Sequence, residues 1–159
     1  VGSNLKKNEN LSLKQNCQIA LKLLPNYGIF LKNISKWYKT APVPISDQPW
    51  YLNSVIQVST LCSPSNLLNS LHEMEKLYGR ERKYKNESRK LDLDIIDFKG
   101  IIKQSNPILP HPRMHERLFV LYPLHDLIPD WVHPYSKKNI AELISESKGN
   151  QIIKSLPIK

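Results

Sequence analysis

The sequence predicts an α+β fold with a ferredoxin-like βαββαβ core, in which helices pack on an antiparallel sheet. Segments with helical and with strand-like patterns follow one another in the order helix, strand, strand, helix, strand. The first residues, 1–5, are typical of a strand end that runs into a turn, so we expect a truncated first strand that completes this order. Since no repeat or linker divides the 159 residues, we expect a single domain over 1–159.

Apolar residues at helical spacing predict the helices. The first core helix falls in residues 10–24 and ends at a Pro-Asn-Tyr-Gly turn. The second begins at Ser63, a capping residue followed by proline at the first helical position, and ends at Gly79. Two additional helices are predicted after the core, one over about 114–127 and one that begins near Ser136.

Alternating or β-branched residues predict three strands, at 33–39, 53–61 and 91–98. The connection from residue 40 to residue 51 is long for a hairpin and contains three prolines. Loops of this length commonly have a function, so this segment is a candidate part of a binding site.

The composition excludes several classes of protein. The mean hydropathy is −0.42, and no apolar run approaches the roughly 20 residues of a membrane span. With only two cysteines, Cys17 and Cys62, a disulfide-stabilised secreted domain is disfavoured, so we expect a cytoplasmic protein with Cys17 in its core. The five glycines form neither a G-x-G-x-x-G turn nor a phosphate loop, so any nucleotide is bound without a glycine cradle.

The charged residues favour anionic partners. The formal net charge is +9, which is compatible with nucleic acids, acidic surfaces or phosphorylated small molecules. Lysines are spread along the chain, whereas all arginines lie between positions 80 and 117. A guanidinium matches two phosphate oxygens at once, so this clustering favours phosphate binding over the alternative of surface ion pairs. The arginines are Arg80, Arg82, Arg89, Arg113 and Arg117.

Asp92 and Asp94 form the main candidate for chemistry. At i and i+2 on a strand, their carboxylates project from one face. One or two carboxylates together with substrate phosphates are the usual ligands of Mg²⁺. Although an isolated Asp-x-Asp is more often solvent-exposed surface, the flanking arginines favour a phosphoryl-transfer site. His111 lies between two prolines that restrict its backbone, and it is a candidate donor to a phosphate.

Short segments over residues 1–135 form a specific pattern. The most specific are R-K-L-D-L-D-I at 89–95 and P-H-P-R at 110–113. Others are G-S-N-L at 2–5, Y-K-T-A-P at 38–42, D-Q-P-W-Y-L-N at 47–53, residues 75–82 and R-L-F at 117–119. Together they resemble the 6-hydroxymethyl-7,8-dihydropterin pyrophosphokinases of folate biosynthesis.

The resemblance implies a ferredoxin-like enzyme that transfers pyrophosphate from ATP to the pterin hydroxymethyl oxygen and releases AMP. It implies two Mg²⁺ ions held by Asp92 and Asp94, and catalytic roles for these aspartates together with Arg82 and Arg89. It assigns ATP binding to Glu75, Arg80, Arg82, Arg89, Ile95, His111 and Arg117. It assigns pterin binding to Thr40, Pro42, Val43, Tyr51, Asn53 and Phe119, with loops at about 41–50 and 82–89 closing over the substrates.

Two other functions are compatible with parts of this pattern. A palm-like nucleotidyltransferase would need a third carboxylate near the pair, and Asp97 has the opposite strand parity. A non-enzymatic nucleic-acid-binding module would place aromatic and basic residues on the strand face where Asp92 and Asp94 repel phosphates. The resemblance implies ATP and the dihydropterin as partners, and we expect no nucleic acid or membrane. We also expect a monomer, because no apolar stripe is left over after the core is assigned.

Overall fold

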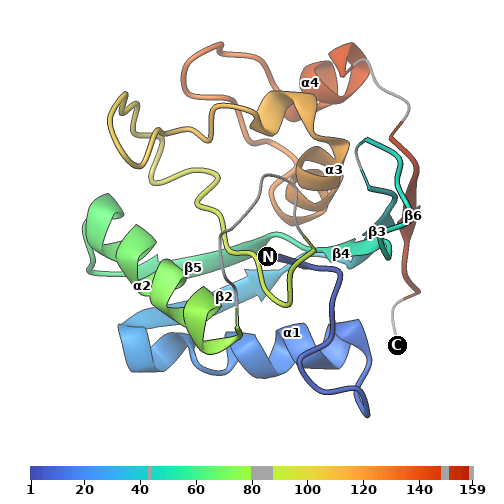
Figure 1. Ribbon diagram of the computed structural model, residues 1–159. Helices are drawn as coiled ribbons and strands as arrows, with labels where there is room; N and C mark the ends of the chain where they lie inside the picture. Colours follow the sequence, from blue (N-terminus) through green and yellow to red (C-terminus); the bar gives the residue numbers. More distant parts are fainter. Residues whose placement is uncertain (43, 80–87, 148–150, 158–159) are drawn as a thin grey trace.

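The computed structural model describes residues 1–42, 44–79, 88–147 and 151–157 (Figure 1). In chain order the elements are β1 (Gly2–Ser3), α1 (Leu13–Leu21), the 3₁₀ helix η1 (Leu24–Tyr27), β2 (Ile29–Ile34), β3 (Tyr38–Thr40), β4 (Tyr51–Asn53), β5 (Ile56–Thr60), α2 (Pro64–Leu77), the 3₁₀ helix η2 (Met114–Glu116), α3 (Leu118–Leu127), α4 (Ile140–Glu146) and β6 (Ile153–Ser155). In Figure 1, α1 and α2 lie near β2 and β5, whereas α3 and α4 lie near the opposite end of the molecule.

The strands form two antiparallel sheets. Four strands pair in the order β1-β4-β3-β6, and β2 pairs with β5. An isolated backbone bridge joins Gly2 to Asp92, so β1 is paired on both of its edges. The predicted α+β class is confirmed. The predicted βαββαβ order is not reproduced element by element, because two of the expected strands are each divided.

Residues 33–39 and 53–61 were each predicted as one strand, and this prediction is wrong. The first corresponds to β2 and β3, and the second to β4 and β5. The hydroxyls of Ser35 and Ser54 lie 2.9 Å apart at the division, and Ser35 Oγ accepts a hydrogen bond from the Val55 amide. Serine side chains thus replace part of the main-chain ladder, which interrupts both strands at the same level.

The strand predicted at 91–98 is reduced to the single bridge at Asp92. Its amide donates to the Gly2 carbonyl at 2.8 Å, and the Gly2 amide donates to its carbonyl at 2.9 Å. One residue later the amide of Leu93 donates instead to the carboxylate of Glu75, also at 2.8 Å. A side chain therefore replaces a strand partner, although Leu91 and Leu93 are buried as the alternating pattern predicts.

Both core helices begin with a side-chain cap. Ser12 caps α1 in a capping box with Gln15, and Ser63 caps α2, with proline at the next position as predicted. Glycines in the left-handed region follow η1 and α2, with φ of +68° at Gly28 and +79° at Gly79. The first helix is shorter than the predicted range 10–24, because it begins after the Ser12 cap and ends at Leu21, before η1.

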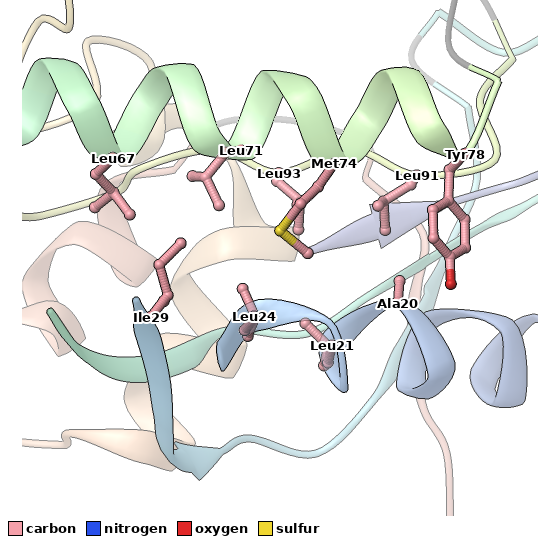
Figure 2. Close-up of a cluster of buried hydrophobic side chains, with 10 residues drawn as sticks. All are labelled: Ala20, Leu21, Leu24, Ile29, Leu67, Leu71, Met74, Tyr78, Leu91 and Leu93. Carbon is pink, nitrogen blue, oxygen red and sulfur yellow. The ribbon is translucent and has the colours of Figure 1, made fainter. Parts of the chain in front are cut away.

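The main apolar core lies between α1 and α2 (Figure 2). Its buried members are Ala20, Leu21, Leu24, Ile29, Leu67, Leu71, Met74, Tyr78, Leu91 and Leu93. A smaller cluster contains Cys17, Trp37 and Leu52, which confirms that Cys17 is a core residue. Burial raises the pKa of its thiol to about 11, so the group is neutral and unreactive at pH 7. Cys17 and Cys62 are both free.

A third cluster joins α3 and α4. It contains Met114, Val120, Leu121, Leu124, Trp131, Ile140 and Leu143. The single helix predicted over 114–127 is divided into η2 and α3, with Arg117 in extended conformation between them. The last helix begins after Asn139, which forms a capping box with Glu142, and not near Ser136.

Part of the apolar surface stays exposed. On β2 the exposed fractions of Phe30, Leu31 and Ile34 are 51%, 44% and 39%. The expectation that no apolar stripe is left over is therefore wrong, and the reason given for a monomer fails with it. None of the helices in the described ranges has the length and apolar character needed to cross a membrane.

We expect the stability of the α3–α4 layer to fall in acid because of His133. Its buried ring accepts hydrogen bonds at Nδ1 from the amides of Tyr135 and Ser136. Burial lowers the pKa of His133, the nearby His115 adds to this, and Asp97 opposes it. The unfolded chain thus binds the proton more strongly, so the free energy of unfolding decreases as pH falls below about 6.5 towards the lower folded-state pKa.

The variant His133→Asn tests this, because an asparagine Oδ1 accepts similar amide hydrogen bonds but does not titrate in this range. Thermal midpoints measured at pH 7.5 and pH 5 should differ less in His133→Asn than in the parent. His125→Asn, at an exposed position of α3, is the control and should keep the parental difference. An unchanged difference in His133→Asn contradicts the prediction.

Candidate active site

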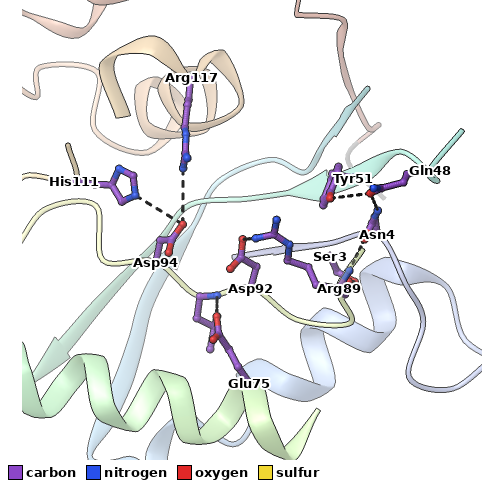
Figure 3. Close-up of polar contacts among 11 residues, drawn as sticks. Ser3, Asn4, Gln48, Tyr51, Glu75, Arg89, Asp92, Asp94, His111 and Arg117 are labelled. Carbon is purple, nitrogen blue, oxygen red and sulfur yellow. Dashed lines mark hydrogen bonds and ion pairs between the residues drawn. The ribbon is translucent and has the colours of Figure 1, made fainter. Parts of the chain in front are cut away.

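Two carboxylates lie together on the segment that pairs with β1. Leu91 and Leu93 point into the core, so Asp92 and Asp94 project from the opposite side, as the sequence predicts. Asp92 accepts a hydrogen bond of 2.6 Å at Oδ2 from Nη1 of Arg89 (Figure 3). This charge-assisted contact neutralises one member of a pair that would otherwise repel itself.

Asp94 faces two basic side chains from a different part of the chain. Its Oδ2 lies 4.0 Å from Nε2 of His111 and 3.9 Å from Nη1 of Arg117, which is beyond hydrogen-bond length (Figure 3). Its carboxylate is half-exposed. Asp94 therefore makes no hydrogen bond to either basic group, and its half-exposed carboxylate can accept a further ligand.

The ring of His111 directs Nε2 towards Asp94 (Figure 3). Its amide donates to the Ile96 carbonyl at 2.8 Å, and its Nδ1 accepts from the Arg113 amide. Burial lowers the pKa of His111, Asp94 opposes this effect, and Arg117 adds to it. The ring is therefore neutral at pH 7 and carries its proton on Nε2, where it can donate to a phosphate oxygen.

The donor set suits a hard divalent cation. Asp92 and Asp94 offer oxygen ligands, which Mg²⁺ prefers, beside cationic groups that match phosphate. Across the part of the chain that the structure describes, no cluster of three or more His, Cys, Asp or Glu side chains could hold a metal. An ion bound here would therefore complete its coordination with water or with oxygens of a bound phosphate.

Glu75 and Asp97 have structural partners. Glu75 is 1% exposed and binds the Leu93 amide from below the aspartate segment (Figure 3). Asp97 accepts from the indole of Trp131 and from the Gly100 amide, so it does not join the carboxylate pair. The sequence predicts this, because Asp97 alternates to the opposite face from Asp92 and Asp94. Ile95, a predicted nucleotide contact, packs at the edge of the main core.

Thr40 and Asn53, two of the predicted pterin residues, lie on the other side of β1 from the aspartate segment. With Tyr51 and Phe119 they are called the pterin wall below. Asn53 and Thr40 are buried on β4 and β3, and Asn53 Nδ2 donates to Thr40 Oγ1 at 2.9 Å. Pro42, two residues after Thr40 in the sequence, is buried as well.

Two aromatic residues of the predicted pterin set lie against arginines. The guanidinium carbon of Arg89 lies 5.7 Å from the ring centroid of Tyr51. That of Arg117 lies 5.6 Å from the centroid of Phe119. These cation–π contacts bring the predicted pterin and phosphate residues together. Three other predicted site residues lie outside the described residues: Val43, Arg80 and Arg82.

Asn4 is a site residue that the sequence argument missed. It is 2% exposed, its Oδ1 accepts from the Arg89 amide at 2.7 Å, and its Nδ2 donates to the Pro49 carbonyl and to Ser88 Oγ. It also reaches Oε1 of Gln48 (Figure 3). Asn4 thus joins the proline-rich loop to the residues before the aspartates. Its only sequence signal is the short G-S-N-L match.

Fold and site together define an α+β protein in which a carboxylate pair is flanked by basic side chains and lies near buried polar residues of β3 and β4. A family model described as "7,8-dihydro-6-hydroxymethylpterin-pyrophosphokinase (HPPK)" matches residues 1–129. The chain belongs to this family, in agreement with the predicted ferredoxin-like class.

Curated relatives include single proteins of similar size and longer proteins. A 2-amino-4-hydroxy-6-hydroxymethyldihydropteridine pyrophosphokinase of Haemophilus influenzae is 38% identical over 80% of this chain and 79% of its own length. A protein of the same name from Synechocystis is 38% identical over 75% of this chain and 61% of its own length. The folic acid synthesis protein fol1 of Schizosaccharomyces pombe is 36% identical over 89% of this chain. The chain spans only 20% of that protein.

Gly2 is expected to determine the position of Asn53. A Cβ added at Gly2 would lie 2.7 Å from Asn53 Oδ1, which real contacts do not allow. Gly2→Ala should therefore displace this side chain and lower the free energy of unfolding by about 1–3 kcal/mol, as overpacking in a core does. Denaturant titration measures the loss.

The control is the same substitution in an Asn53→Ala background. Because the obstructing oxygen is then absent, Gly2→Ala should cost much less there, which is a coupling that a double-mutant cycle detects. Equal costs in the two backgrounds would show that Gly2 acts through something other than Asn53.

Proposed function

We propose that this chain transfers pyrophosphate from ATP to the hydroxymethyl group of 6-hydroxymethyl-7,8-dihydropterin and releases AMP, with residues 1–159 acting as one domain. The observation that carries the proposal is the carboxylate pair Asp92 and Asp94, bordered by Arg89, His111 and Arg117. Membership of the family and the names of the two relatives from Haemophilus influenzae and Synechocystis support the same activity.

The basic residues hold the phosphates. Arg89 contacts Asp92 from the same segment, and Arg117 approaches Asp94 from the start of α3 (Figure 3). Each offers a planar set of donors for phosphate oxygens. The neutral His111 donates from Nε2 without adding charge repulsion between the two arginines. Burial lowers the pKa of Arg117 while Asp94 opposes the effect, and a guanidinium remains charged at pH 7 in any case.

Asp92 and Asp94 would hold Mg²⁺, with two ions proposed. When bound there, Mg²⁺ neutralises phosphate charge and orients the reacting groups. Arg89 already neutralises Asp92, so it can exchange part of that contact for phosphate when the ion arrives. Asp94, at 3.9 Å or more from its basic neighbours, can take a ligand without breaking a hydrogen bond to either of them.

The residues of the pterin wall hold the pterin. A pterin is planar, with donors and acceptors along one edge, so the amide of Asn53 and the hydroxyl of Thr40 can orient it. Tyr51 and Phe119 offer rings for stacking. Because Arg89 and Arg117 lie over these same two rings, the pterin would be held next to the phosphates.

The proposed reaction is a displacement at the β-phosphorus of ATP. The hydroxymethyl oxygen forms a bond to this phosphorus, and the bond from it to the oxygen bridging to the α-phosphate breaks. That oxygen leaves with AMP, and the hydroxyl proton is released to water. Such a transfer depends mainly on positioning and on stabilisation of charge, which are what the described residues supply.

Incubation with ATP, Mg²⁺ and 6-hydroxymethyl-7,8-dihydropterin tests the proposal. AMP and the pterin diphosphate should form in equal amounts, and no AMP should form without the pterin. Formation of ADP, or of pyrophosphate with a nucleotide-linked product, would overturn it.

Asp94→Asn should lower AMP formation by at least ~100-fold, since lost charge stabilisation by the ion amounts to several kcal/mol. The fold should survive, because Asp94 is half-exposed and is not needed for the core. Thermal midpoints without Mg²⁺ should stay close to the parental value, because Asp94 makes no hydrogen bond with His111 or Arg117. The control is Asp130→Asn, at an exposed position. Near-normal turnover in Asp94→Asn, or an unfolded protein, contradicts the metal assignment.

Asn53→Ala should raise KM for the pterin about tenfold, the value of one well-placed hydrogen bond, and leave KM for ATP unchanged. Steady-state kinetics with each substrate varied in turn measures both constants. The matched control is Asn33→Ala, whose amide bonds Gln57 on the exposed β2–β5 ribbon. A similar rise in both KM values would refute the assignment of Asn53 to pterin binding alone.

A further inference from the structure

The segment 151–156 lies beyond the residues that the family model matches, yet it contacts the site. Its strand β6 pairs with β3, so that Ile153 lies opposite Thr40 (Figure 1). The Ile152 carbonyl accepts from the Ala41 amide at 3.1 Å, which continues the pairing into the proline-rich loop. Lys154 adds a contact of 5.6 Å to the ring centroid of Trp50 in that loop.

Gln151, two residues before β6, contacts the backbone around Arg117 at the proposed phosphate site. Its Oε1 accepts from the Leu118 amide at 3.0 Å, and its Nε2 donates to the Glu116 carbonyl at 2.9 Å. These two backbone groups stand on either side of Arg117. The side-chain amide of Gln151 therefore hydrogen-bonds to the backbone on both sides of Arg117.

The backbone at Arg117 needs such a partner. Arg117 is the residue before α3, has φ −114° and ψ +97°, and makes no side-chain cap to the helix. The first amides of a helix have no intrahelical acceptor, so Leu118 depends on an external one. Gln151 supplies it from a residue 33 positions away, whereas N-caps are ordinarily local.

We infer that Gln151 is a positioning residue, which holds the Arg117 guanidinium at Asp94 by fixing the backbone on both sides of Arg117. The inference rests on the proposed function, in which Arg117 holds phosphate. Because β6 pairs with β3, the sheet in turn holds the segment that carries Gln151 in place. A displacement of about 1 Å at a phosphate donor is enough to lower turnover strongly.

The test compares Gln151→Ala with the parent protein in two independent measurements. Hydrogen exchange of the Leu118 amide should be at least tenfold faster in Gln151→Ala, because its acceptor is lost. The kcat/KM for ATP should fall about tenfold, whereas KM for the pterin should stay unchanged. Ser155→Ala, an exposed β6 residue that pairs through its backbone, is the matched control and should match the parent in both.

A double-mutant cycle separates positioning from general destabilisation. If Gln151 acts through Arg117, then Gln151→Ala should cause no further loss of kcat/KM in an Arg117→Ala background. Gln151→Glu keeps the acceptor for the Leu118 amide but opposes the Glu116 carbonyl, so slow exchange at Leu118 should return while activity recovers only in part.

Unchanged amide exchange in Gln151→Ala overturns the inference whatever the activity is. Parental activity in that variant, or an additive loss in the double variant, overturns it as well. A parent protein that forms no AMP at all refutes the proposed function, and with it the role of Gln151, so the two failures are distinguishable.

Discussion

The two-residue strand β1 is the constraint on which the site depends, because it is hydrogen-bonded along both edges. On one side Gly2 exchanges two main-chain hydrogen bonds with Asp92, and on the other it lies opposite Asn53 in β4. This single strand therefore places the carboxylate pair next to the pterin wall, although the two are separated by about 40 residues in sequence. The absence of a side chain at Gly2 lets Asn53 lie directly against the backbone.

Around this strand, side chains hold the loops that regular pairing does not reach. Asn4 binds the Arg89 amide, Glu75 binds the Leu93 amide, and Gln151 binds the Leu118 amide. Each of these amides adjoins or belongs to a residue that borders the proposed phosphate site. Because a buried backbone group without a partner is costly, such contacts restrict a loop to one conformation. The site thus gains rigidity from residues that need not touch a substrate.

The arginines near the site differ in how deeply they are buried. Arg89 and Arg117 are partly buried beside Asp92 and Asp94, where reduced solvent screening strengthens their effect. Arg113, in contrast, is 58% exposed on its side chain and lies 3.9 Å from Glu116, which is typical of a weak surface ion pair. Clustering in the sequence therefore identified the region of the arginines but could not separate those that face the carboxylates from one that faces solvent.

Features that depend on local spacing could be predicted from the sequence. Ser63 and Gly79 bound α2 as predicted, and the alternation of Leu91 and Leu93 with the aspartates placed both carboxylates on one side, because caps and periodicity act within a few residues. Other features depend on contacts between distant segments. These are the division of the strands at Ser35 and Ser54, the single bridge within 91–98, and the hydrogen bonds of Asn4 and Gln151 at the site. In each of these cases a side chain bonds to the backbone or side chain of a distant segment. No local pattern encodes such a partner, since the choice depends on which unpaired groups folding brings within hydrogen-bond distance.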